Sequence, residues 1–235
     1  MSEAEAGAAV RPPRPEQADG PSGATGARRL TVVLAVLVLL AAAVLAALAM
    51  RRSGHPGTDS AEAGFARDMS THHAQAVRMS FIVRDRTDDE PVRLLAYDII
   101  TTQQAQIGMM TAWLDEWGLP KTDPAGHMRW MGGHHGGASP APQAGSQTGA
   151  DGAVMPGMAT RTQLRELEAA SGRDAEVRYL RLMIAHHRAG VEMARAVLER
   201  TDLPRVRRLA QSMVNGQQSE ITLMTRMLAE RGATP

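Results

Sequence analysis

The feature that most constrains the fold of this chain is an internal repeat. Residues 65–118 align with residues 179–232 at a constant offset of 114 positions and without a gap, and 22 of the 54 aligned positions are identical. Chance would give only a handful of matches, so the two segments are copies of one structural unit. We therefore expect both copies to adopt the same fold.

Each copy is predicted to form a helical hairpin, because its apolar residues recur at helical spacing on both sides of a short break. The breaks coincide in the two copies. Thr87 and Thr201, each followed by Asp, supply N-cap residues, and Pro91 and Pro204 stand in a first helical turn, where proline is tolerated. The four predicted helices span residues 62–86, 89–117, 174–200 and 203–231.

The predicted fold class is all-α, since no segment shows the alternation of a strand. One hairpin alone cannot bury its apolar face, so the two should pack as an antiparallel four-helix bundle over residues 61–232. This bundle consists of a first hairpin (61–118), a Gly/Pro/His/Met-rich loop (119–159), and a short helix with the second hairpin (160–232).

The N-terminal region predicts a membrane anchor. Residues 1–29 lack apolar periodicity and should form a disordered tail. Residues 30–50 carry no charge, and a 21-residue helix would span about 31 Å, close to the ~30 Å hydrocarbon core of a bilayer. Residues 51–60 form a linker. A cleavable signal peptide is the alternative, with a cleavage-like site at 47–49, but its apolar region is normally only about 7–15 residues long.

The orientation of this anchor is weakly encoded, because two arginines flank the apolar segment on each side. We expect a single-pass protein of the cell membrane with its short tail in the cytoplasm and its bundle on the extracytoplasmic side. A single N-terminal anchor usually serves that arrangement.

Histidine and methionine recur together in the first helix of each copy. The sequences MSTHHAQAVRM and MIAHHRAGVEM share Met-x-x-His-His followed by a second Met. At 100° per residue, Met69, His72 and Met79 lie on the apolar stripe and His73 lies at its edge. The second copy repeats this arrangement with Met183, His186, His187 and Met193.

The second helix of each copy carries two polar residues within its apolar stripe. These are Gln103 and Gln106 in the first copy, and Gln217 and Glu220 in the second. Burying such groups without a partner costs about 1–3 kcal/mol each. We therefore expect the inward imidazoles to bond to them. Met110 and Met224 lie on the same two faces.

This set of donors favours copper. Imidazole and thioether together suit Cu(I), and imidazole alone can bind Cu(II). The chain has no cysteine, which excludes thiolate sites and disulfides, and no Glu-x-x-His motif of the kind that di-iron bundles use. The alternative is a metal-free polar network, because buried Met is usually core packing and an inward His is usually a hydrogen-bonded core residue.

A looser cluster of the same residue types lies in the connecting loop. It predicts either a low-affinity capture segment or a linker with chance His and Met. Its members are His127, Met128, Met131, His134, His135, Met155 and Met158.

The sequence shows no nucleophile with a base, no phosphate-binding glycine loop and no paired catalytic carboxylates, so we do not expect an enzyme. A net charge of +1 gives no reason to expect binding to nucleic acid.

The motifs FARDMSTHHAQAVRM and YLRLMIAHHRAGVEM, the QQxxI helix after each, and MPGMAT at 155–160 resemble the family called domain of unknown function 305. The resemblance covers about residues 60–232. It implies a ferritin-like fold, a secreted or membrane-anchored location and, for some members, periplasmic copper binding and resistance. The residues that it assigns to the metal are Met69, His72, His73, Met79, Met110, Met183, His186, His187, Met193 and Met224.

The function predicted from these features is copper buffering, transfer or resistance by a membrane-anchored extracytoplasmic protein that binds Cu(I) or Cu(II). A structural or interaction bundle without metal is the main alternative. A copper-dependent redox enzyme is a weaker third, because the sequence offers no substrate pocket.

Overall fold

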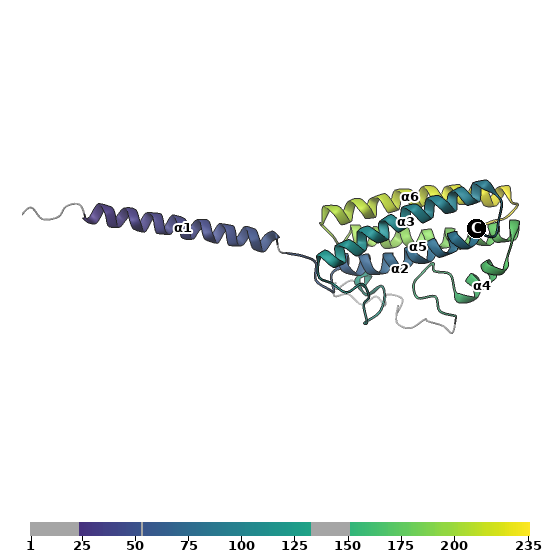
Figure 1. Cartoon of the computed structure of the whole chain (residues 1–235), viewed down its shortest axis with the longest axis horizontal. Coiled ribbons are helices and arrows are strands. Elements are labelled where there is room, and N and C mark those ends of the chain that lie inside the picture. Colours follow the sequence, from purple (N-terminus) through teal and green to yellow (C-terminus); the bar gives the residue numbers. More distant parts are fainter. Residues whose placement is uncertain (1–23, 53, 133–150) are drawn as a thin grey trace, which may run out of the picture. The chain divides into compact units, whose positions relative to one another are not determined.

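The structure is a computed structural model that describes residues 24–52, 54–132 and 151–235. The chain divides into two units, residues 1–54 and 55–235, and each is described by itself. All regular secondary structure among the described residues is helical, which confirms the all-α class (Figure 1). Residues 1–23 of the predicted disordered tail, and His134 and His135 of the loop, lie outside the described residues.

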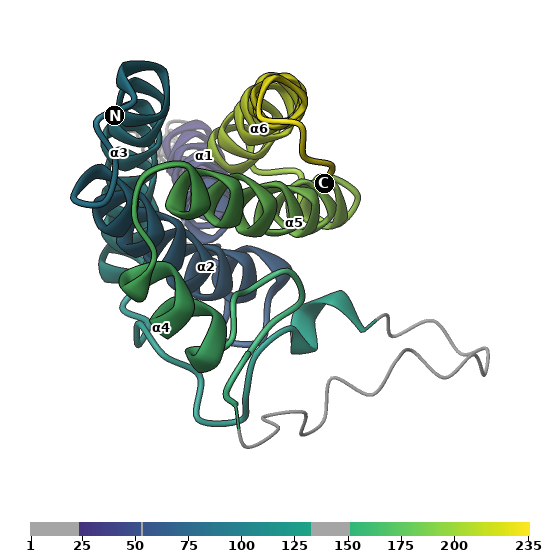
Figure 2. The same ribbon diagram turned by 90° about the vertical axis from the view of Figure 1, so that its right-hand side faces the viewer.

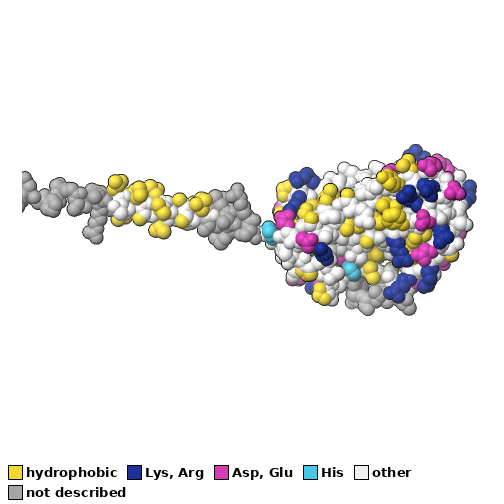
Figure 3. Space-filling view, in the orientation of Figure 1, with side chains coloured by type: hydrophobic (Ala, Val, Ile, Leu, Met, Phe, Trp, Pro, Cys, Tyr) yellow, Lys and Arg dark blue, Asp and Glu magenta, His cyan; other side chains and the backbone are white. Residues whose placement is uncertain are grey.

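The first unit contains helix α1, Ala24–Arg52, whose side chains are described over residues 29–45. Its large apolar residues are exposed on all sides, from Leu30 (68 %) to Leu45 (67 %), and cover its surface in Figure 3. Within the described residues, no helix is both long enough and apolar enough to cross a membrane. The anchor at residues 30–50 therefore stays a prediction.

The second unit contains every helix that the sequence predicts for the bundle, and the four long helices begin and end within two residues of the predicted positions. A short helix, α4, precedes the second hairpin, and a 3-10 turn, η1, lies in the connecting loop. The elements are α2 (Ala61–Arg84), α3 (Glu90–Glu116), η1 (Arg129–Met131), α4 (Arg161–Ala169), α5 (Gly172–Leu198) and α6 (Pro204–Glu230).

The start of each second helix differs in detail from the prediction. Thr87 and Thr201 are not N-caps, because they lie two positions before the N-cap residues Asp89 and Leu203. Each threonine hydroxyl instead accepts a hydrogen bond from the N–H of that N-cap residue, at 3.0 and 3.2 Å. Asp89 then caps α3 by accepting from the N–H of Val92.

Two hydrogen bonds related by the repeat join the hairpins. Thr87, after the end of α2, donates to Glu176 near the start of α5 at 2.6 Å. Thr201, after the end of α5, donates to Glu62 near the start of α2 at 2.7 Å. Since each bond joins one helix's end to the other's beginning, α2 and α5 run antiparallel, and the offset of 114 makes their packing pseudo-twofold symmetric.

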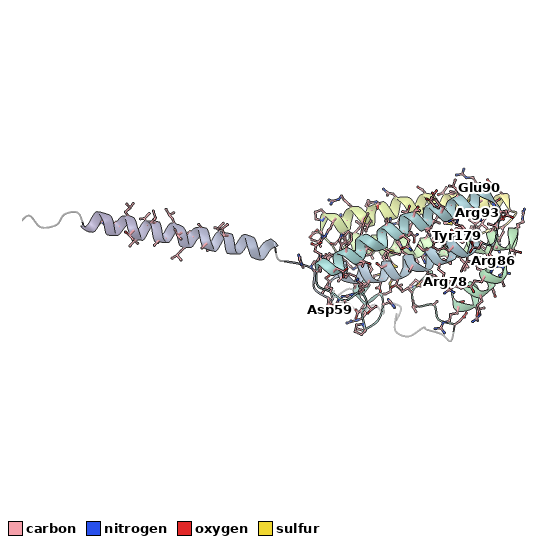
Figure 4. The ribbon with its side chains drawn as sticks, in the orientation of Figure 1. Asp59, Arg78, Arg86, Glu90, Arg93 and Tyr179 are labelled. Carbon is pink, nitrogen blue, oxygen red and sulfur yellow. The ribbon has the colours of Figure 1, made fainter. Side chains whose placement is uncertain are left out.

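The hairpins pack on each other mainly through α2 and α5, while α3 and α6 lie on the outer sides (Figure 2). Two apolar clusters fill the interior. One contains Tyr179, which is fully buried, whose hydroxyl is 2.9 Å from that of Ser80, and which is labelled in Figure 4. The other contains Phe65, which meets the ring of Trp130 edge to face at 5.9 Å.

The loop after the first hairpin is fixed to α2 by one buried carboxylate. Asp68 accepts from His127 Nδ1 at 2.6 Å, from the N–H of Met128 at 2.8 Å and from Trp130 Nε1 at 2.9 Å. These bonds seat Trp130 directly on Gly64, where an added Cβ would overlap the indole ring.

This contact gives a test of the fold with a matched control. Gly64→Ala should lower the free energy of unfolding, because overpacking costs about 1–3 kcal/mol and exceeds the gain in helix propensity. Gly108→Ala should raise it by about 0.5–1 kcal/mol, because Gly108 is helical and has open space beside it. Chemical denaturation of both variants measures the difference. Equal stabilisation by the two substitutions would show that Trp130 does not pack on α2.

Candidate metal centre

Two histidines meet where the hairpins pack. His72 of α2 and His186 of α5 stack with ring centroids 3.7 Å apart and planes inclined by 30°, and both are 1 % exposed. They are equivalent residues of the repeat, so the pseudo-twofold axis passes near their contact. The sequence predicts this inward position, and the structure agrees.

The second histidine of each doublet is also buried. His73 and His187 are 0 % exposed rather than at the edge of the apolar stripe. His73 Nε2 lies 2.7 Å from Gln106 Oε1 on α3, and the equivalent bond joins Nε2 of His187 to Oε2 of Glu220 on α6, also at 2.7 Å. The second imidazole of each doublet therefore satisfies the polar residue on the partner helix.

This pairing only partly fulfils the expectation that imidazoles satisfy all four polar residues. Gln103 and Gln217 are buried, as predicted, but the Oε1 atom of each has no partner. Gln217 Oε1 instead packs onto Gly190, where an added Cβ would overlap it. The imidazoles of His72 and His186 stack on each other, and neither forms a hydrogen bond to Gln103 or Gln217.

Several buried ring nitrogens consequently lack a hydrogen-bond partner. Buried polar atoms are nearly always paired, so a group of unpaired ones at one place marks it as a candidate site. The unpaired nitrogens are His72 Nδ1, His72 Nε2, His73 Nδ1, His186 Nε2 and His187 Nδ1.

Burial keeps the imidazoles of His72, His73 and His186 neutral. Loss of hydration, and then the proximity of His73 and His187, lowers the pKa of His72 to about 3. The nearby Pro156 carbonyl acts in the opposite direction and raises the pKa of His72, although neither ring nitrogen of His72 has hydrogen-bond geometry to a partner. Burial, opposed by the Gln106 bond, lowers the pKa of His73 to about 4, and burial lowers that of His186 well below its usual value. Neutral imidazole is the form that binds metals.

The segment around residues 155–160 covers the centre on the side away from α3 and α6. The backbone of Gly157, at φ +74°, approaches α5 so closely that an added Cβ would lie 2.7 Å from the Ala185 carbonyl oxygen and 3.3 Å from His186 Cα. On α2, Gln75 donates to the carbonyl of Ala159 at 2.9 Å and accepts from its N–H at 2.6 Å.

Sequence reasoning missed Gln75. Its equivalent in the second copy is Ala189, whose small side chain admits Gly157. The two copies thus differ at this position because one loop contacts both. The sequence signal that could have identified this position is the difference between Gln75 and Ala189, which lie just after the His-His motif that the two copies share.

The six predicted methionines are all buried, with at most 1 % exposed. They divide equally between the two apolar clusters. Met69 and Met183 lie three residues before a stacked histidine, or about 4.5 Å along the helix axis, and Met79 and Met193 lie about 10.5 Å beyond it. One cluster contains Met69, Met110 and Met193, and the other contains Met79, Met183 and Met224.

Not all predicted donors come together. Among the described residues, no three His, Asp or Glu side chains are placed to hold one ion. Stacked imidazoles present their faces to each other, whereas their nitrogens bind a metal in the ring plane, so a shared ion requires one ring to turn. The described residues of the loop cluster form no separate site: His127 is tied to Asp68, Met155 belongs to one apolar cluster, and Met128, Met131 and Met158 pack against that same cluster.

The donor set nevertheless fits a soft or borderline cation. The four buried histidines, His72, His73, His186 and His187, form a layer between the two apolar clusters that contain the methionines (the histidine layer). The acid that reaches this layer is Glu220, which bonds to Nε2 of His187. The molecule is thus a duplicated helical bundle with buried histidines near its pseudo-twofold axis and buried methionines in the two apolar clusters.

A model of the family described as domain of unknown function (DUF305) matches residues 62–228. The chain belongs to this family, as the sequence motifs predict. No curated protein matches the chain significantly.

The chain resembles several solved structures, among them the following three. A putative secreted DUF305 protein from Streptomyces coelicolor is 52 % identical, with a TM-score of 0.66 over 76 % of this chain and 98 % of that one. A DUF305 fragment from Deinococcus radiodurans is 31 % identical, with a TM-score of 0.56 over 72 % and 96 %. CopM in its Cu(II)-bound form is 24 % identical, with a TM-score of 0.52 over 72 % and 95 %, which shows likeness of fold.

The buried histidines predict a pH dependence of stability. His72, His73 and His186 stay neutral in the folded chain, whereas histidines of the unfolded chain take up protons below their usual pKa of 6.5. The free energy of unfolding should therefore fall as the pH decreases from about 6.5 toward about 4, by up to about 1.4 kcal/mol per pH unit for each histidine. His186→Asn should reduce the slope. A free energy that stays constant between about pH 7 and 5 would contradict the burial of neutral imidazoles.

Proposed function

We propose that this protein binds copper through the histidine layer and its flanking methionines, and buffers or passes the ion on the extracytoplasmic face of the membrane. The observation that carries the proposal is the set of five unpaired ring nitrogens buried between two methionine-containing clusters. A bound ion would satisfy groups that otherwise cost free energy.

The residues suggest how an ion is held. Ring nitrogens of the four histidines supply the first donors, and Met69 and Met183 stand one helical turn from the stacked pair. Met110 and Met224 supply thioethers from the outer helices. A buried, uncharged donor set of this kind suits Cu(I), and imidazole also accepts Cu(II). The cover formed by residues 155–160 excludes water from the layer.

The comparison with CopM agrees with this proposal, because CopM has a similar fold and its structure is in the Cu(II)-bound form. At 24 % identity that likeness is one of fold. The argument for copper in this chain therefore depends on its own histidines and methionines.

A neighbouring pair of methionines tests the role of thioethers. Met110 is fully buried in the cluster with Met69, whereas Met109 is 49 % exposed. Met110→Leu preserves volume at a cost below about 1.5 kcal/mol of stability, and should weaken Cu(I) binding at least about tenfold. Met109→Leu should leave the affinity unchanged. Competition against a chromophoric Cu(I) chelator measures both, and equal affinities in the two variants would remove Met110 from the site.

The competing function is a structural bundle with a polar core and no metal. The bonds from His73 to Gln106 and from His187 to Glu220 favour it, because each satisfies one nitrogen of a buried imidazole without an ion. Copper that binds the folded chain must raise its melting temperature by mass action. Equilibrium dialysis that finds no Cu(I) or Cu(II) affinity tighter than about millimolar, with no thermal shift, would establish the metal-free alternative.

The membrane location is part of the same proposal. Its support is the helix α1, which is apolar on all sides over its described residues. In a cell fractionation, Leu37→Arg with Leu40→Arg should move the full-length protein from the membrane to the soluble fraction, because each arginine costs about 2.5–3.5 kcal/mol at the centre of a spanning helix. The double alanine variant is the control. Retention of the arginine variant in the membrane would place the anchor elsewhere.

A further inference from the structure

We infer that the two halves of the centre are chemically unequal, and that Glu220 is a positioning residue that commits Nδ1 of His187 to metal binding. The second half then takes a divalent cation such as Cu(II) before the first half does. The part of this inference that concerns the metal rests on the proposed function, whereas the part that concerns the imidazole does not.

The two halves have the same geometry. In each, Nε2 of the second histidine meets an oxygen on the partner helix at 2.7 Å, and Nδ1 is buried without a partner. The residues that provide these oxygens, Gln106 and Glu220, are equivalent positions of the repeat. The halves therefore differ at this contact in chemistry and not in distance.

A carboxylate and an amide impose different protonation on the imidazole. The Glu220 carboxylate can only accept, so Nε2 of His187 must donate, and Nδ1 is the nitrogen whose lone pair is available to a metal. Gln106 can accept through its oxygen or, after turning its amide, donate through its nitrogen. His73 can therefore place its proton on either nitrogen, and in one of the two states its Nδ1 has no lone pair.

Charge adds to this difference. A buried cation needs an anionic partner to offset its desolvation. Asp68 is bonded to His127 and Trp130, and Glu176 to Thr87 and Arg231. Among the described acidic residues, Glu220 is the one bonded to a histidine of the central layer. The second half thus has one negative charge that the first half lacks.

The expected consequence is a difference in affinity that grows with the charge of the ion. A carboxylate that accepts from the far nitrogen of a ligating histidine raises the basicity of that ring, and loss of such a partner weakens metal binding about 10–100-fold. The affinity for Cu(II) should depend on the carboxylate more strongly than the affinity for Cu(I), because the charge of Cu(II) is larger.

The first experiment examines the metal-free protein. Nitrogen-15 NMR of the histidine rings should show His187 as one tautomer with the proton on Nε2. Glu220→Gln should convert His187 to a mixture, and Gln106→Glu should convert His73 to the single Nε2–H form. These signals report the ring protonation directly, which a merely structural role of the carboxylate would not change. A wild-type His187 with its proton on Nδ1, or a tautomer that does not respond in either variant, would overturn the inference.

The second experiment adds Cu(II) alone as the probe. The full-length wild-type chain should bind a first Cu(II) more tightly than a second, and electron paramagnetic resonance should resolve two unequal signals. Glu220→Gln should weaken the tighter site about 10–100-fold. Gln106→Glu should strengthen the weaker site and bring the two signals together. If Glu220→Gln does not fold, the response of Gln106→Glu decides the question.

The outcomes of the two experiments are distinguishable. Absence of copper binding by a chain that shows the expected tautomers would end the proposed function and the metal part of this inference, but not the role of Glu220. Copper binding at two equal sites in the wild-type chain would overturn the inequality of the halves and leave the proposed function standing.

Discussion

The packing of α2 on α5 at the His72–His186 stack is the contact on which the rest of the structure depends. Both apolar clusters are built from residues of both hairpins, and the polar layer between them lies where the two first helices meet. Two imidazoles can stack at 3.7 Å because burial keeps them uncharged. The apolar clusters on either side supply the burial that offsets the unpaired nitrogens between them.

The duplication explains most of this architecture. Positions at which the two copies differ make the two sides of the histidine layer chemically different. The hydrogen bonds from Thr87 to Glu176 and from Thr201 to Glu62 are symmetric and serve to join the hairpins. Positions 75 and 189 differ because one covering segment contacts both copies. Gln106 and Glu220 differ in charge while they keep the same distance to histidine.

The centre combines two properties that a metal carrier needs. The lowered pKa values of His72, His73 and His186 keep these imidazoles neutral in the folded chain, so a metal does not have to displace protons from them. Its thioethers and imidazoles come from four helices that tertiary packing brings together, so the site depends on the fold. The close approach of Gly157 to α5 and the bonds from Gln75 to Ala159 hold the cover in place over this layer.

The sequence by itself determined the helices, the duplicated hairpins and the inward direction of Met69, His72 and their equivalents, because helical period and repeat are local properties. Only the tertiary structure decided that His73 and His187 take Gln106 and Glu220 as partners, and that Gln103 and Gln217 keep unpaired oxygens. Those contacts depend on the rotation of each helix about its axis and on the distance between helices. An apolar stripe about 100° wide determines neither the rotation of the helix nor its distance from the next helix.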